Sequence, residues 1–239
     1  MSSVISDFRS GLTAFEAPLD ARLAFVRRTY VHVAGASLAF VATSALFQSL
    51  GLGEWMLGLM ARGRWVWLLI LLGFSGAGMF AQSMARSHRS SGTQYGGMGL
   101  FVAMEAVLFA PLIFIASLPQ YGNTLGIAAG LTVLAFGALS AFALTTKKDF
   151  SFLGPFLGVA FIVAMGLIVC GAIFGFNLGI WFAGAMILVA VGSILFSTSK
   201  VLHVYRTDEH AAASLELFAG VALLFWYVLS ILLQTQRRN

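Results

Sequence analysis

Seven long apolar stretches constrain this chain more than any other feature of its sequence. A helix needs about 20 mostly apolar residues to cross the hydrocarbon core of a bilayer. Seven such windows follow one another with short connections, and they are too long and too uniformly apolar for the strands of a membrane β-barrel. The sequence therefore predicts an all-α polytopic membrane bundle of seven transmembrane helices, at Tyr30–Leu50, Trp65–Ala85, Gly97–Leu118, Thr124–Leu144, Phe152–Phe174, Leu178–Phe196 and Ala213–Leu233.

The composition favours lipid as the solvent for most of the surface. Hydrophobic residues make up 59% of the chain and charged residues 10%, against about 25% charged residues in soluble domains. The net charge of +5 comes from basic residues that stand singly or in pairs. Such residues orient membrane helices, so we expect no nucleic-acid binding.

Three regions are expected along the chain. In residues 1–29, apolar side chains recur every three or four positions among charged ones, which predicts a cytoplasmic amphipathic arm at the membrane surface, interrupted near Pro18. Because this arm contains acidic residues and no apolar stretch before Tyr30, we expect no cleavable signal peptide. Residues 30–233 form the predicted seven-helix transmembrane domain, and residues 234–239 form a short carboxyl-terminal tail.

The basic residues also predict an orientation. With seven spans, ten of the fourteen Lys and Arg residues fall on the side of the amino terminus. Because Lys and Arg concentrate in cytoplasmic loops, we expect a multi-pass protein of the cell membrane with its amino terminus in the cytoplasm. A last segment that re-entered the membrane without crossing it would bring the carboxyl terminus to that side too.

Two carboxylates fall inside the predicted spans. Glu105 lies in the third span and Glu216 near the start of the seventh, both toward the expected cytoplasmic side. Ionisable residues in a membrane usually face the bundle interior or a wet cavity, so both are candidates for an ion pathway or for pH sensing. Alternatively, Glu216 is an interfacial residue at a helix start, and Glu105 is neutral and hydrogen-bonded to a neighbouring helix.

The connection between the sixth and seventh spans is the most polar part of the chain. We expect one polar cluster on the cytoplasmic side there, formed with the two glutamates by Lys200, His203, Arg206 and Asp208. Oxygen ligands of this kind would suit Ca²⁺, although no metal signature is present and we expect no resident cofactor. No pair of nucleophile and base can be drawn, so we expect no enzymatic activity.

The chain resembles the Bax inhibitor-1 family of seven-span membrane proteins, as a bacterial-type member, over essentially all of its length after residue 27. The resemblance rests on the order and spacing of five segments: Arg28-Thr-Tyr-Val-His-Val-Ala-Gly, Met104-Glu-Ala-Val-Leu-Phe-Ala-Pro, Thr146-Lys-Lys-Asp-Phe-Ser-Phe-Leu, Ile194-Leu-Phe-Ser-Thr-Ser-Lys-Val-Leu-His and Ala211-Ala-Ala-Ser-Leu-Glu-Leu-Phe. It implies a seven-helix fold, a cytoplasmic amino terminus and a pH-sensitive calcium leak or transport role.

In well-studied members that role depends on two aspartates, one at the end of span six and one in span seven. Ser197 and Phe218 stand at the corresponding positions here, and Glu216 lies two residues before the second, about 200° around the helix. Glu105 matches the family's glutamate in span three. The resemblance therefore implies a leak for Ca²⁺ or H⁺ involving Glu105, Glu216 and Ser197. The alternative is a non-conducting regulator that binds a membrane protease or a stress-response partner through the arm.

Overall fold

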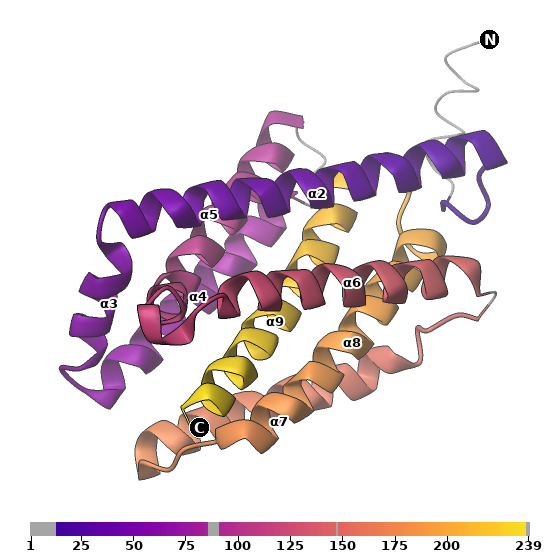
Figure 1. Cartoon of the computed structure of the whole chain (residues 1–239). Helices are drawn as coiled ribbons and strands as arrows, with labels where there is room; N and C mark the ends of the chain where they lie inside the picture. The colour runs from indigo at the N-terminus through magenta and orange to yellow at the C-terminus, as the bar shows by residue number, and fades with distance from the viewer. Residues whose placement is uncertain (1–12, 86–90, 147, 238–239) are drawn as a thin grey trace.

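The computed structural model describes residues 13–85, 91–146 and 148–237 of the chain, and these residues are almost entirely helical (Figure 1). Short connections join the helices, and one of these connections contains the 3-10 turn η1 (Pro119–Tyr121). The α-helices of the described residues are α2 (Leu19–Ser49), α3 (Leu52–Met60), α4 (Arg64–Ala85), α5 (Ser91–Ala116), α6 (Thr124–Thr145), α7 (Leu153–Phe174), α8 (Gly179–His203) and α9 (His210–Gln236).

The predicted all-α bundle with seven membrane-spanning helices is confirmed. Every helix except α3 contains a stretch that is long and apolar enough to cross a bilayer. The last of them, α9, is one continuous helix of 27 residues, about 40 Å at 1.5 Å per residue. Its length is sufficient for a complete crossing, which favours a seventh span over a re-entrant segment.

Several helix ends differ from the predicted windows, and three differences from the prediction matter for the rest of the fold. Helix α2 begins at Leu19, directly after Pro18, and runs without a break past Tyr30, because proline suits the start of a helix better than its interior. The amphipathic prediction for residues 1–12 lies outside the described residues. The nine-residue helix α3 was not predicted, since it is too short to cross a membrane and only turns the chain from α2 into α4.

The third difference affects the candidate site. Helix α8 continues beyond Phe196 to His203, so Lys200 and His203 are helical and do not belong to a loop as predicted. Polar residues are tolerated in this last part of α8 because several of them find partners on neighbouring elements, as described below.

The alternating directions of the spans give the bundle two faces. We call the end where α2, α5, α7 and α9 begin the amino-terminal face, and the opposite end the carboxyl-terminal face. Helix α9 is central, since it packs against α2, α4, α5, α6 and α8. In Figure 1 it runs between α2 and α5 on one side and α8 on the other.

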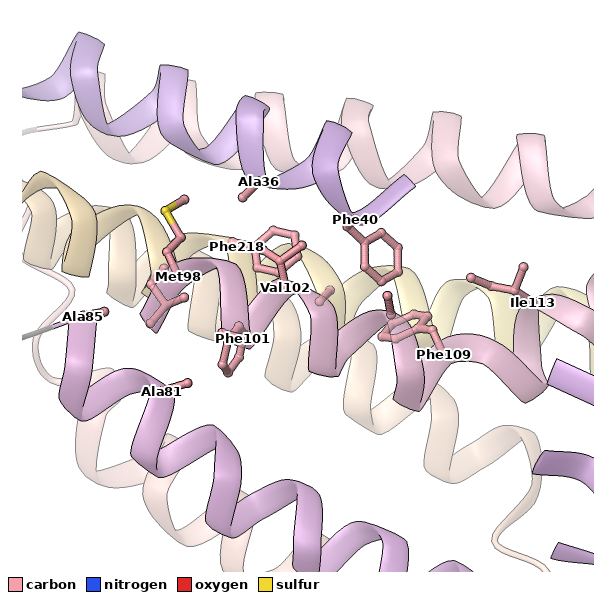
Figure 2. Packing of buried hydrophobic residues seen from close by; sticks show 13 residues of the cluster. Ala36, Phe40, Ala81, Ala85, Met98, Phe101, Val102, Phe109, Ile113 and Phe218 are labelled. Carbon is pink, nitrogen blue, oxygen red and sulfur yellow. The ribbon is translucent and has the colours of Figure 1, made fainter. Parts of the chain in front are cut away.

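The largest core cluster is aromatic and joins α2, α4, α5 and α9 (Figure 2). The ring of Phe40 packs edge-on against Phe109, with centroids 5.1 Å apart. Phe218 is 2% exposed, and its ring lies 6.1 Å from that of Phe40 and 6.2 Å from that of Phe101. Because lipid tails are as apolar as these side chains, close packing holds the helices together more than water exclusion does.

Candidate functional site

An ion pair joins α8 to α9 near the amino-terminal face. Lys200 Nζ lies 2.8 Å from Glu216 Oε1 and 2.7 Å from Oε2, so it contacts both carboxylate oxygens. The two side chains are 20% and 19% exposed. Since most of each group is removed from solvent, the attraction is screened less than at an open surface. Lys200 therefore neutralises Glu216 in this structure.

Two hydroxyl groups also contact Glu216. Tyr205, in the turn after α8, donates a hydrogen bond to Glu216 Oε2, and Ser197 donates one to Oε1 at 3.2 Å. The Lys200 ammonium also lies 5.3 Å from the centroid of the Phe196 ring and 5.4 Å from that of Tyr205, which is within the range of cation–π attraction. We call Ser197, Lys200, Tyr205 and Glu216 the clamp.

The described end of the amino-terminal arm reaches the clamp through Tyr205. The backbone N–H of Ala14 donates to the carbonyl of Tyr205 at 3.0 Å. Arg22 in turn donates to the carbonyls of Ala14 and Phe15, at 3.0 and 2.7 Å. Ala14 is fully buried. Tyr205 therefore contacts the arm through its backbone and Glu216 through its hydroxyl group. A displacement of Tyr205 would change both contacts.

The other predicted members of the polar cluster are distributed differently. His203 Nδ1 hydrogen-bonds to the carbonyl of Ser199 at 3.0 Å, and its ring stacks near that of Phe15, with centroids 5.1 Å apart. Arg206 and Asp208 form an ion pair of 3.5 Å, but their side chains are 42% and 46% exposed. Exposed pairs of this kind contribute about 0–1 kcal/mol, so this pair belongs to the surface.

Asp149, which the sequence reasoning missed, attaches the loop between α6 and α7 to α8. Ser199 donates to Asp149 Oδ1 at 2.9 Å, while the N–H of Phe150 donates to Ser199 Oγ at 3.0 Å. Hydrogen bonds from the Ser151 hydroxyl and backbone N–H, and from Ser199, lower the pKa of the Asp149 carboxyl. The stretch Asp149-Phe-Ser-Phe carries no recognisable motif, so only the fold reveals this contact.

Glu105 lies apart from the clamp. It is 8% exposed, on α5, about 21 Å along the axis from the start of that helix. Among the described residues, no hydrogen bond or ion pair reaches its carboxyl group, and no metal-binding group of acidic, His or Cys residues is found. The expected single cluster containing both glutamates is therefore not formed: Glu216 faces α8, whereas Glu105 faces a cavity.

This cavity, called here the central cavity, has a volume of about 640 Å³. Its wall is formed by residues of α4, α5, α7, α8 and α9, with contributions from Met60 of α3 and from the connection between α7 and α8. That connection and Gln234 near the end of α9 belong to the carboxyl-terminal face. The cavity thus extends from this face to Glu105 at the middle of the bundle.

A second polar contact missed by the sequence reasoning joins α2, α5 and α9. The hydroxyl group of Tyr95 lies 3.0 Å from His32 Nε2 and 3.1 Å from His210 Nε2. The two imidazole centroids are 5.0 Å apart. The residues are 63 and 115 positions apart in sequence, and His32 has no histidine one helical turn away, so nothing local signals the contact.

Fold and site together define a multi-pass helical membrane protein with a half-buried clamp near one face and an acidic cavity reached from the other. The profile of the family described as "Inhibitor of apoptosis-promoting Bax1" matches residues 22–238. The chain belongs to this family.

Named relatives agree with the family profile. Bax inhibitor 1 of Schizosaccharomyces pombe is 29% identical over 98% of this chain and 85% of its own length. The Golgi anti-apoptotic protein of vaccinia virus is 27% identical over 97% and 94%. The Modulator of FtsH protease YccA of Escherichia coli is 30% identical over 55% of this chain and 60% of its own. A Pseudomonas aeruginosa relative is matched over 51% of its length, so the chain spans only about half to three fifths of these two bacterial proteins.

Proposed function

We propose that the protein is a closed cation leak pathway, for H⁺ or Ca²⁺, in which Glu105 receives the cation from the central cavity. The single observation that carries this proposal is the buried Glu105 carboxyl group, which faces a cavity that extends from the carboxyl-terminal face. An ionised carboxylate at this depth in the membrane is energetically costly, and such residues usually mark a binding site or an ion pathway. The cavity has room for about 20 waters at ~30 Å³ each.

Two layers close the pathway beyond Glu105 in this proposal. The first is the aromatic packing of Phe101 against Phe218, an apolar constriction of the kind that excludes water. The second is the clamp, in which Lys200 occupies Glu216 and places a positive charge near the amino-terminal face. Opening then requires that these side chains separate, which links conduction to the clamp.

One carboxylate suits a proton better than it suits a held calcium ion. Ca²⁺ takes six to eight oxygen ligands, and Glu105 supplies at most two. Calcium would keep most of its hydration water in the cavity, whereas a proton needs only the carboxylate and a water chain. We therefore rank H⁺ first and Ca²⁺ second as the permeating cation.

The test is flux through purified protein in liposomes loaded with a pH dye or a calcium dye, across about pH 6 to 8. We expect flux above empty liposomes, loss in Glu105→Gln, and an increase in Lys200→Met because the clamp is broken. Glu54→Gln is the matched control, since Glu54 is an exposed residue of α3. No flux with either dye at any pH, for wild type and Lys200→Met alike, would refute the leak.

We also propose a second function, regulation of a membrane protease of the FtsH type, without conduction. It is supported by the relative YccA, which is named as a modulator of the FtsH protease, and by the arm contact with Tyr205, which a partner could replace. A partner that binds the arm would remove the Ala14 contact and loosen the clamp. Deletion of residues 1–17 is expected to abolish co-purification with the protease, whether or not the protein conducts ions in proteoliposomes. Retained co-purification would refute this function.

The proposed orientation places the amino terminus in the cytoplasm. Among the described Lys and Arg residues, six lie toward the amino-terminal face and three toward the opposite face, an excess that the positive-inside rule associates with the cytoplasmic side. Reporter fusions at the two termini test this orientation. A fluorescent protein should fold at the amino terminus and a periplasmic phosphatase should be active at the carboxyl terminus; the reverse pattern would overturn the assignment.

A further inference from the structure

The walls of the central cavity combine one acidic group with several aromatic rings. Among the described lining residues, Glu105 is the only Asp or Glu, and no Lys, Arg or His is present. Phe74, Phe109, Phe182 and Trp226 come from four different helices and line the same space. Polar Asn177 and Gln234 belong to the carboxyl-terminal end of the wall. The cavity is therefore apolar and aromatic along its sides and carries its acidic group deep inside.

Glu105 needs a partner that the described part of the protein does not provide. Its side chain is 8% exposed, and no hydrogen bond or ion pair joins it to a described residue. A buried carboxylate without a partner is strongly unfavourable, and a cation with N–H donors relieves that cost. Glu105 and Phe109 are four residues apart on α5, so they share one face of the helix and a ligand reaches both.

The aromatic rings suit the rest of such a ligand. Phe109 and Trp226 pack edge to face with centroids 4.9 Å apart, and both border the cavity that Glu105 enters. Aromatic faces attract ammonium groups and bury apolar bodies. The volume of about 640 Å³ lies within the range of about 300–1,000 Å³ for small-molecule sites.

We propose that the central cavity binds a hydrophobic amine, with its ammonium group on the Glu105 carboxylate and its apolar body against the rings of Phe109 and Trp226. A lipid ammonium headgroup, as in phosphatidylethanolamine, has the same charged end but brings a phosphate. That phosphate would have no cation among the described lining residues. A free amine is therefore the assigned occupant. Binding does not require that ions cross the membrane, so this proposal is separate from the leak.

The test uses the full-length protein in phosphatidylcholine nanodiscs and isothermal titration, with empty nanodiscs as the reference for partitioning. The probes are 3,3-diphenylpropylamine and the matched neutral alcohol 3,3-diphenylpropanol. We expect the amine to bind about tenfold to a hundredfold more tightly than the alcohol, the range of a charge-assisted hydrogen bond. Glu105→Gln should remove this preference while the alcohol still binds, which also shows that the variant is folded.

Two further variants locate the site. Ala172→Phe adds a ring to the α7 wall at a half-buried position and should weaken both probes. Glu54→Gln should change neither. Equal affinity for amine and alcohol, a preference that persists in Glu105→Gln, no effect of Ala172→Phe, or no binding above empty nanodiscs would each overturn the proposal.

A change in the lipid composition of the nanodiscs distinguishes a free amine from a lipid headgroup as the source of the ammonium group. Replacing part of the phosphatidylcholine by phosphatidylethanolamine should leave the amine affinity unchanged; competition would overturn the assignment of a free amine. The same preparation is used for flux. Absent flux with intact, Glu105-dependent amine binding would refute the leak alone, whereas flux without amine binding would refute this proposal alone.

Discussion

The clamp predicts a measurable coupling between Lys200 and Glu216. Lys200→Met keeps a long unbranched side chain but removes the ammonium group from the Glu216 carboxylate, while the hydroxyl donors Ser197 and Tyr205 remain. Breaking a fully buried pair costs about 3–5 kcal/mol. Because about a fifth of each side chain is exposed, water recovers part of this, and we expect a loss of about 2–3 kcal/mol in the free energy of unfolding.

The reverse change is expected to cost less. In Glu216→Met the lysine keeps its charge, and its long stem lets the ammonium move toward water at the amino-terminal face. We expect a loss of about 1–2 kcal/mol, and a similar loss in the double variant, where two apolar side chains meet. Since the double variant loses about as much as Glu216→Met alone, the coupling energy between the two positions equals the loss in Lys200→Met, about 2–3 kcal/mol.

The assay is equilibrium unfolding of the four proteins in mixed micelles with increasing denaturing detergent, followed by circular dichroism. The same double-mutant cycle on Arg206 and Asp208, whose ion pair is exposed, should give a coupling energy of about 0–1 kcal/mol. If the Lys200 and Glu216 changes add within about 0.5 kcal/mol, the pair does not hold α8 to α9, and the role of the clamp in closing the bundle is refuted.

Three further predictions concern other contacts. Gly97→Val should disrupt the packing of α4 against α5 and lower the yield of folded protein in size-exclusion chromatography, because a Cβ at Gly97 would meet the Ala81 carbonyl oxygen at 2.6 Å; a normal elution profile would contradict this. The lowered pKa of Asp149 means that its contact with Ser199 persists above the ordinary aspartate pKa of about 3.9 and is lost as the pH falls below it. Hydrogen exchange at the α6–α7 loop, corrected for intrinsic rates, should therefore be unchanged between about pH 7 and 5 and faster only below about pH 4, whereas a rise already at pH 5 would refute the assignment. Tyr95→Phe removes the hydroxyl group shared by the two histidines and should lower the free energy of unfolding by about 1–2 kcal/mol, and a change below about 0.3 kcal/mol would show that the contact is not maintained.

The number of membrane-spanning helices could be predicted from the sequence. A segment in lipid must satisfy its backbone hydrogen bonds internally, so each apolar window had one available structure. The ends were less predictable. Lys200 is a polar residue of the kind expected in a loop. It nevertheless belongs to α8, because Glu216 on α9 accepts its hydrogen bond and balances its charge.

The sequence did not predict which polar side chains contact one another. Both glutamates were selected because intramembrane charges are rare, but their grouping in one cluster was wrong. Glu216 points to α8, while Glu105 points to a cavity bordered by α4, α7 and α9. Asp149, His32 and Tyr95 carried no local pattern that would have selected them.

The sequence by itself determined that the chain is a seven-span helical membrane protein. The length of each apolar segment is a local property, and it alone decides whether that segment can span the bilayer. Only the tertiary structure decided that Lys200 neutralises Glu216, that Tyr205 joins the arm to the clamp, and that Glu105 faces the central cavity. These facts depend on how each helix is rotated about its axis. That rotation is set by close packing, as at Gly97 and Phe109, and packing between helices is a property of pairs that no single segment encodes.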